Sequence, residues 1–475
     1  MENEEKPKSK PSRPQRPNRR PRRSTVNPFG ENTARGVAYD IITRAVKADD
    51  RFDQIWDHHG GLGRLSTRDR ALAIHLASGV LRRLRMLDSR AVQLTEGKFK
   101  GLGEPVQWIL RLGLFQITDC DRIQPHAAVS TAVEAAKIAS HKGIAGLVNA
   151  VLRRAARERE TPTATSKSEP PSWGERLSMP DWLVELLFAR YGEDRSRDIA
   201  RWANSIPHMY LRLAKEGPGL ERLNQLLEEA HLHPARPHHE FAEYASIETS
   251  ALVPDSPILK EPIGWVQNPA AGMVVRLLDP QPGEEVLDLF AAPGGKTLAI
   301  AEAVGPQGRV YAVDRSAERL KRLIENKTRF AADNILPIEG DVAQLGERFS
   351  MRILADAPCS ALGTLPKNPE VRWTKTPADV ERLARSQKIW LALAAKHVSP
   401  GGILVYATCT ITAQENEDVV QDFLDTNSDF TLESAKGFVP DRYVTSGGCL
   451  ATTPPVDGLD GVFAARFRRK SPTAS

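Results

Sequence analysis

The chain has 475 residues, of which 41% are hydrophobic, and a formal net charge of +5. At roughly 100–200 residues per domain this length suggests two to four domains, and the composition is ordinary for a soluble protein. No run of about 18 apolar residues occurs, so the sequence predicts no transmembrane helix. The charged, proline-rich start has no apolar signal-peptide core.

The cysteines are few and widely spaced. The chain has four of them, at Cys120, Cys359, Cys409 and Cys449, with no C-x-x-C pair. This pattern argues against a disulfide framework and a zinc site, so we expect no metal ion and a reducing, cytoplasmic setting. We interpret Cys120 and Cys449 as buried structural residues, the usual role of a lone cysteine.

The first residues form a basic tail. Residues 1–25 carry nine Lys and Arg against three Glu, so their charge of +6 exceeds that of the whole chain. Because this stretch is rich in Pro and Arg and nearly free of apolar residues, we predict a disordered tail over residues 1–32. Such an arm either binds phosphate backbones without reading sequence or only solubilises the protein, and composition favours neither.

Residues 33–157 are predicted to form an all-helical bundle. One helix starts at Ser66-x-x-Asp69, a capping pattern, and continues with Leu76 and Val80 at helical spacing. Paired arginines add positive charge to this bundle, namely Arg82, Arg83, Arg153 and Arg154. Paired arginines are usually a solvated helix face, so RNA binding by this region needs other support.

A Pro/Ser/Thr-rich linker is predicted over residues 158–175. Residues 176–265 then favour two short helices anchored by Trp182 and Trp202, followed by a small α/β unit that begins with the strand-like run "MYLRLA".

Residues 266–470 have the pattern of a doubly wound, mostly parallel α/β sheet. From about Pro282, short apolar runs alternate with helical patterns. Ligands of such Rossmann-like sheets bind beyond the carboxyl ends of the strands. Five predicted strands end at polar or unusual residues, which we expect to converge on one crevice: Asp288, Asp314, Asp341, Asp356 and Cys409.

The stretch "VLDLFAAPGGKT" joins a strand, a glycine turn and a helix start. A P-loop would need a glycine at Phe290, and a dinucleotide turn would need separated glycines where Gly294 and Gly295 are adjacent. The remaining interpretation is a turn that brings the backbone close to a ligand without a long phosphate chain, because neither glycine has a Cβ.

Two acidic residues extend this interpretation. Asp314 lies 20 residues beyond Gly294, where an acidic residue accepts from ribose hydroxyls. Asp341 follows the third strand and suits an adenine amino group. Together they fit S-adenosyl-methionine as the cofactor. The alternative is that an acidic strand end only caps the next helix.

Four ordered motifs carry a family resemblance: "LDLFAAPGGKT", "DAPCSALGTLPKNPEVRW", "YATCT" and "DGVFAARF". They resemble the Sun-type RNA cytosine-C5 methyltransferases, and the helical region resembles the NusB-like RNA-binding domain of the ribosomal members. The resemblance spans roughly residues 33–469. It implies a class I methyltransferase fold, S-adenosyl-methionine as cofactor and a cytosine of small-subunit 16S ribosomal RNA as substrate.

We further expect a monomer with no membrane or DNA partner. Two alternatives stay open. One is a non-catalytic RNA-binding or ribosome-assembly factor, which the presence of Cys409 and Asp356 disfavours. The other is a methyltransferase of tRNA or protein, and the NusB-like region argues against the protein substrate.

The chemistry of cytosine explains why a methyltransferase of carbon 5 needs a reactive cysteine. Carbon 5 of cytosine is a poor nucleophile, but a thiolate that adds to carbon 6 makes carbon 5 enamine-like and ready for methylation. Spacing alone does not choose between Cys359 and Cys409. The resemblance implies that Cys409, in the "TC" strand end, attacks, and that Cys359, in the Pro-Cys turn, assists product release.

Two further residues are expected to act on the base. Asp356 suits donation to the ring N3 if burial keeps it protonated, and it suits equally a cap of its own turn. The resemblance implies that Lys296 orients the substrate, although it could instead pair with a nearby carboxylate. The expected cofactor contacts are Phe290, Ala291, Ala292, Pro293, Gly294, Gly295, Lys296, Asp314, Asp341 and Asp356.

Three residues after the Cys359 turn are candidates for RNA contacts. Lys367 and Arg372 are expected to hold phosphates and Trp373 to stack a base, unless Trp373 anchors the loop to the core. The chain also departs from the family pattern at four positions: Asn268 where Asp is common, Phe290 where Cys is frequent, Ala361 where Gly is usual, and Thr410 where Ser is usual.

Overall fold

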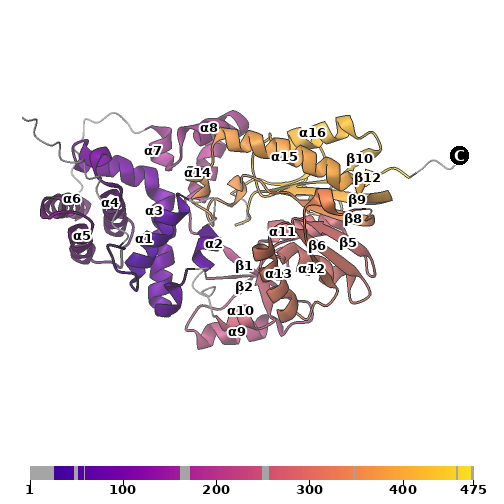
Figure 1. The fold of residues 1–475 in the computed structure, drawn as a ribbon, viewed down its shortest axis with the longest axis horizontal. Helices are drawn as coiled ribbons and strands as arrows, with labels where there is room; N and C mark the ends of the chain where they lie inside the picture. Colours follow the sequence, from indigo (N-terminus) through magenta and orange to yellow (C-terminus); the bar gives the residue numbers. More distant parts are fainter. Residues whose placement is uncertain are drawn as a thin grey trace, which may run out of the picture.

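The computed structural model describes residues 26–47, 52–57, 59–160, 172–248, 256–346, 348–455 and 458–471. Residues 1–25 of the predicted tail and residues 161–171 of the predicted linker lie outside this description. Figure 1 shows a helical bundle in indigo and violet, a connector with a small sheet, and a large sheet between two layers of helices. No helix in the described residues is long and apolar enough to cross a membrane.

The amino-terminal part is an all-helical bundle around one apolar core, as predicted. Its helices are α1 (Ala34–Ala45), α2 (Phe52–Asp57), α3 (Thr67–Leu94), α4 (Glu104–Thr118), α5 (Pro125–Ala139) and α6 (Lys142–Glu160), with short turns η1 (Leu62–Arg64) and η2 (Lys98–Gly101). Ser66 caps α3 by accepting a hydrogen bond from the Asp69 N–H at 3.1 Å, which confirms the capping pattern. Leu76 and Val80 of α3 are fully buried.

Within the described residues, the connector consists of four helices and a small antiparallel sheet. Its helices are α7 (Trp173–Leu177), α8 (Asp181–Ala203), α9 (Gly219–Glu229) and α10 (Pro257–Lys260), and its strands pair in the order β2 (Arg236–Pro237), β3 (Tyr244–Ile247), β1 (Met209–Leu213) and β4 (Gly264–Val266). Gly192 has the non-helical angles φ 73° and ψ 171° and breaks α8 in two. The sequence prediction of two helices followed by a strand at residue 209 is therefore correct.

The carboxy-terminal part is an eight-stranded mixed sheet. The order along the sheet is β10 (Phe430–Glu433), β12 (Val462–Arg469), β9 (Val398–Thr408), β8 (Ser350–Asp356), β5 (Glu285–Leu289), β6 (Arg309–Asp314) and β7 (Ile335–Glu339), with β11 (Leu450–Thr452) paired to β12. The strands from β9 to β7 are parallel, β12 is antiparallel to β9, and β10 and β11 each pair antiparallel with β12. The Rossmann-like class predicted from the alternating pattern is confirmed.

Helices cover both faces of this sheet (Figure 1). One face packs on α11 (Pro269–Leu278), α12 (Gly295–Val304) and α13 (Ala317–Arg329), and the other packs on α15 (Pro377–Lys396) and α16 (Glu417–Thr426). Adjacent strand residues point to opposite cores: Ile353 joins the α15 side and Leu354 joins the α11 side. Burial on both faces explains why these strands are continuous apolar runs.

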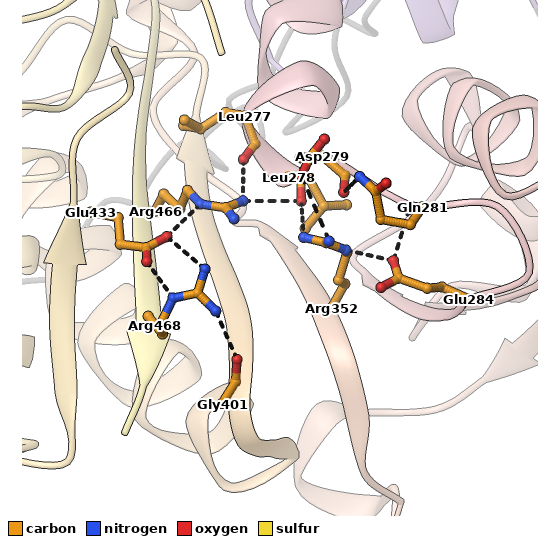
Figure 2. A network of polar contacts seen from close by, with 10 residues as sticks. All are labelled: Leu277, Leu278, Asp279, Gln281, Glu284, Arg352, Gly401, Glu433, Arg466 and Arg468. Carbon is orange, nitrogen blue, oxygen red and sulfur yellow. Dashed lines mark hydrogen bonds and ion pairs between the residues drawn. The ribbon is translucent and has the colours of Figure 1, made fainter. Parts of the chain in front are cut away.

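Helix α11 is held at both of its ends. At its carboxyl end, Arg466 donates to the Leu277 carbonyl at 2.7 Å, and Arg352 donates to the Leu278 carbonyl at 3.0 Å (Figure 2). Basic groups at this end also complement the helix dipole. At its amino end, Asn268 caps the helix by accepting from the Ala270 N–H at 3.0 Å. The arginine network thus fixes α11 at the amino ends of the parallel strands, opposite the carboxyl ends that carry the candidate site.

Candidate active site

The carboxyl ends of the parallel strands bring the predicted site residues to one edge of the sheet. Asp314 ends β6, Asp356 ends β8, and Cys409 follows β9. Because β8 lies between β5 and β9, with β6 beyond β5, these residues share that edge. Asp288 is different: it lies inside β5, is only 1% exposed, and accepts a hydrogen bond from Thr297 at 2.6 Å. It is a buried structural group rather than a strand-end ligand.

The two candidate reactive cysteines touch each other. Their sulfurs lie 3.3 Å apart, and the Cys409 N–H donates to the Cys359 sulfur at 3.3 Å. The hydrogen bond with Cys409, followed by burial, raises the pKa of Cys359 well above its usual value. Two sulfurs at this distance do not ionise together, and the raised pKa of Cys359 favours its thiol form.

Lys296 pairs with Asp356. Its Nζ lies 2.6 Å from the Asp356 Oδ2. Burial alone would lower the pKa of Lys296, but the negative charges of Asp356, Cys409 and Asp288 together raise it. Lys296 is therefore held in its ammonium form. This contact matches the carboxylate-pairing alternative considered for Lys296.

The glycine turn leads directly into α12. Gly294 has φ 102°, and a Cβ placed there would lie 3.1 Å from the Leu323 side chain, so this position requires glycine. The residue before the turn, Phe290, also has a positive φ of 62° and packs against Trp390 at a ring distance of 5.3 Å. The Ala292–Pro293 peptide bond is cis. The amino end of α12 thus opens beside the strand ends.

The two acidic residues expected at the cofactor have backbone partners. Asp314 is 3% exposed and accepts from the Ser316 and Ala292 N–H groups at 3.0 and 3.3 Å. Arg319 pairs with it at 2.8 Å. Asp341 accepts from the Ala343 N–H at 3.0 Å and so caps the short turn η4 (Val342–Gln344). The capping alternative holds for Asp341, whereas Ser316 rather than Asp314 caps α13, and the contacts of both acidic residues with a cofactor stay a prediction.

Unpaired buried donors lie beside the glycine turn and test whether it fits S-adenosyl-methionine. Gln267 is 6% exposed and Trp265 is 3% exposed. Their side-chain nitrogens, Nε2 and Nε1, have no hydrogen-bond partner among the described residues. Both atoms lie within 3.9 Å of where a Gly295 Cβ would stand. Together with the acidic strand ends they suit a ligand with both anionic and amino or hydroxyl groups.

Sequence reasoning missed Gln267 and Trp265. The sequence offered no signal for them, because the Tyr244 hydroxyl that donates to the Gln267 Oε1 at 2.7 Å lies 23 residues away. That contact turns the amide nitrogen of Gln267 toward the glycine turn.

The expected RNA contacts after Cys359 are wrong. We call residues 362–374 the docking segment; it includes η5 (Leu362–Thr364) and α14 (Val371–Thr374). Arg372 is fully buried and donates to the carbonyls of Ser178 and Ala203 and to the side chain of Asn204. Burial, reinforced by the nearby Arg82 charge, lowers the pKa of Arg372 to about 9. It cannot hold a phosphate in this position.

The residues near Arg372 also form their contacts within the protein. Trp373 donates its indole N–H to the Leu81 carbonyl at 2.7 Å, which supports the anchoring alternative. Lys367 pairs with Asp460 at 2.7 Å. Arg82, expected on the bundle surface, is 7% exposed and donates to the Pro366 carbonyl at 2.8 Å. The docking segment therefore joins the large sheet to the bundle and the connector.

The departures from the family pattern have local explanations. Thr410 keeps the hydroxyl of the usual serine and lies 2.7 Å from the Ser360 hydroxyl. Asn268 accepts from the Asp460 N–H at 3.2 Å and donates to the Gly458 carbonyl at 3.4 Å. Ala361 has φ 59°, a conformation that favours the glycine it replaces.

The remaining cysteines and the cavities lie outside this site. Burial raises the pKa of both Cys120 and Cys449 to about 12, so neither is a reactive thiol. A cavity of about 330 Å³ lies beside Arg212 and Arg276, and one of about 550 Å³ lies between α8 and α15, and neither is lined by the cysteines or the glycine turn. Among the described residues, no three His, Cys, Asp or Glu side chains form a metal-binding cluster.

Comparisons with protein families divide the chain in the same way. A family described as 16S rRNA methyltransferase RsmB/F matches residues 275–468, and the NusB family matches residues 32–157. A probable ribosomal RNA small subunit methyltransferase B of Synechocystis sp. is 34% identical over 445 residues, or 92% of this chain and 99% of that protein. The ribosomal RNA small subunit methyltransferase B of Vibrio cholerae is 36% identical over 81% of this chain and 88% of its own.

Solved structures share the fold. The crystal structure of PH0851 superposes with a TM-score of 0.75 at 23% identity and covers 94% of this chain and 100% of its own. NSun6 from Pyrococcus horikoshii, solved with SFG, superposes with a TM-score of 0.54 at 20% identity over 61% of this chain and 98% of its own. A methyltransferase homolog from the same organism gives a TM-score of 0.53 at 26% identity over 62% of this chain and 97% of its own.

Proposed function

This chain belongs to the RsmB/F family of 16S rRNA methyltransferases, and from that premise we propose that it methylates carbon 5 of a cytosine through a covalent adduct with Cys409. In more general terms, the protein is a methyltransferase of small-subunit ribosomal RNA that uses S-adenosyl-methionine. The observation that carries the finer proposal is the pair of cysteine sulfurs, not joined by a disulfide, that lie 3.3 Å apart at neighbouring strand ends.

S-adenosyl-methionine supplies the methyl group. The residues that we expect to hold it are the glycine turn, Asp314 and Asp341, with Gln267 and Trp265 as additional donors. Unpaired buried nitrogens support this assignment, because a buried donor without a partner is costly unless a ligand satisfies it.

Cys409 is the proposed nucleophile. Its thiolate forms a bond to carbon 6 of cytosine, and the electron pair of the carbon 5–carbon 6 double bond makes carbon 5 nucleophilic. Once carbon 5 has taken the methyl group, which leaves S-adenosyl-homocysteine, a base removes the carbon 5 proton. The released electron pair re-forms the carbon 5–carbon 6 double bond, and the carbon 6–sulfur bond breaks to restore the thiolate. The nearby Lys296 ammonium supports the thiolate form of Cys409 before attack and after release.

Cys359, Lys296 and Asp356 are assigned to the proton movements. Asp356 is assigned to the ring N3 of the base, and the Lys296 ammonium, 2.6 Å from its Oδ2, holds the carboxyl group in place. Cys359 stays a thiol during attack and assists release of the methylated base. The raised pKa of Cys359 supports this division of roles.

Two substitutions test the assignment. Cys409→Ala should abolish methylation, whereas Cys359→Ala should trap a protein–RNA adduct that survives denaturing electrophoresis, because attack proceeds and release does not. The measurement uses 16S rRNA and tritiated S-adenosyl-methionine, with Cys449→Ala as the matched control. An adduct with Cys409→Ala and none with Cys359→Ala would reverse the two roles.

The substrate itself is tested by bisulfite sequencing of RNA from a deletion strain. Loss of one methylcytosine from small-subunit ribosomal RNA is the expected result, and loss from tRNA instead would contradict the proposed substrate. Action as a monomer in the cytoplasm, without a membrane or DNA partner, stays a prediction. The basic tail over residues 1–25 lies outside the described residues, and its part in RNA binding also stays a prediction.

A further inference from the structure

A buried carboxylate lies beneath the two cysteines. Glu415, in the turn before α16, is fully buried. Its Oε1 accepts from the Ser360 N–H at 2.8 Å and from the Gln387 amide at 3.1 Å. Its Oε2 accepts from the hydroxyls of Ser360 at 2.5 Å and Thr412 at 2.9 Å. A buried carboxylate is tolerated only with such hydrogen bonds.

The partners of Glu415 belong to both cysteine loops. Ser360 directly follows Cys359, and Thr410 directly follows Cys409. Their hydroxyls lie 2.7 Å apart, and Thr410 also donates to the Glu415 Oε2 at 3.3 Å. One carboxylate therefore connects the residues that come next after the two sulfurs.

Neighbouring contacts extend this connection into the helix and the strand. The Gln387 amide, on α15, also donates to the Pro358 carbonyl at 2.9 Å, just before Cys359. The Tyr406 hydroxyl, on β9, donates to the Glu415 carbonyl at 2.6 Å. Glu415 is thus held from both sides and has little freedom to follow a loop that moves.

We propose that Glu415 is a positioning residue for methyl transfer, which sets the separation of the Cys359 and Cys409 sulfurs through Ser360 and Thr410. The inference rests on the proposed function, because it matters only if both thiols act on the base. A small displacement of a reacting group is expensive, and an error of about 1 Å reduces a rate by about 100-fold.

The charge of Glu415 adds a second effect on the same pair. After the hydrogen bond with Cys409 and burial, the negative charge of Glu415 helps to raise the pKa of Cys359. Cys359 thereby remains protonated while Cys409 attacks, which keeps the two sulfurs from competing for the base.

The test compares Glu415→Gln, which keeps the shape and removes the charge, with Glu417→Gln. Glu417 is the matched control because it lies two residues away, is half exposed, and pairs with Arg190. The expected loss for Glu415→Gln is about 10- to 100-fold in single-turnover methylation, with an unchanged dissociation constant for S-adenosyl-methionine. Glu417→Gln should match the wild type in both.

A second readout needs neither RNA nor turnover. Iodoacetamide labels thiolates, so the pH at which Cys359 becomes alkylated, measured by mass spectrometry, reports its ionisation. In Glu415→Gln this alkylation should move to lower pH. An unchanged alkylation profile together with unchanged methylation would overturn the inference, as would a loss of cofactor affinity parallel to the loss of rate.

Ser360→Ala covers the case in which Glu415→Gln does not fold. It removes the hydroxyl link between the loops and leaves the carboxylate in place, so the methylation rate should fall while Cys359 alkylation keeps nearly its wild-type profile. A wild-type rate in Ser360→Ala would contradict the positioning role. Failure of the proposed function gives a different result, namely no adduct in Cys359→Ala and no methylcytosine with the wild-type enzyme.

Discussion

The two sides of the candidate site are supported in different ways. On the glycine-turn side, Asp314 contacts only residues of its own sheet and helices, such as Ala292 and Arg319. On the cysteine side, the loop after Cys359 continues into the docking segment, where Arg372 bonds to the connector. The cofactor side therefore draws on the large sheet and on the connector, which supplies Trp265 and positions Gln267 through Tyr244, whereas the cysteine side also depends on the bundle.

The largest expected effect concerns the stability contributed by Asp288, on the cofactor side. Burial raises the pKa of Asp288 from 3.8 to about 7, so the folded protein favours its neutral form. That contribution to stability is present below pH 4 and is lost as the pH rises through 7. Asp288→Asn should therefore be the more stable protein at pH 8, by a difference on the order of 4 kcal/mol, and should match the wild type near pH 4.

Urea unfolding of both proteins without cofactor, from pH 4 to pH 8, measures this difference. Asp333→Asn is the matched control, because Asp333 is exposed and should give no pH-dependent difference. A constant offset between Asp288→Asn and the wild type at every pH would show that Asp288 is ionised throughout.

The second largest effect is expected when the contacts of Arg372 with the connector are removed from the cysteine side. Arg372→Met leaves the carbonyls of Ser178 and Ala203 without their donor, which should destabilise the protein by about 3 kcal/mol. The exposed Arg201 pairs only with Asp198 one turn away, so Arg201→Met should cost less than about 0.5 kcal/mol.

Methylation and cofactor affinity, both measured in Arg372→Met, distinguish the two sides of the site. At a temperature where Arg372→Met remains folded, methylation should fall while the affinity for S-adenosyl-methionine stays at the wild-type value, measured by calorimetry. Equal losses in both quantities would mean that the glycine-turn side also depends on the contacts that Arg372 makes.

Sequence patterns predicted most of the cofactor side and only part of the cysteine side. The apolar strands, Gly294 and the two reactive cysteines were all visible as local patterns. Arg372 was misread because an arginine in a loop is usually exposed. The carbonyl partners of Arg372 and Trp373 lie 169 to 292 residues away, so the sequence could not choose between RNA contact and anchoring for Trp373. Glu415 was missed for the same reason, since Ser360 lies 55 residues before it.

The smallest expected effect concerns the turn that follows Cys359. Ala361 has a positive φ, which costs an alanine about 1 kcal/mol relative to glycine, and part of this is offset because glycine is more flexible when unfolded. Ala361→Gly should therefore stabilise the protein by about 0.5 kcal/mol. Ala357→Gly, at a position held extended by Pro358, should instead destabilise it by a similar amount.

Thermal unfolding of the two variants measures these opposite signs. If Ala361→Gly lowers the melting temperature as Ala357→Gly does, the left-handed turn carries no strain.

The docking segment changes how the boundary between the bundle and the large sheet should be understood. The backbone passes from one to the other once, by way of the linker and the connector, but side chains cross in both directions: Arg82 reaches Pro366, and Trp373 reaches Leu81. A hinge needs a boundary that few contacts cross. The bundle and the loop that carries Cys359 are therefore joined by side-chain contacts as well as by the backbone, so a displacement of one is transmitted to the other.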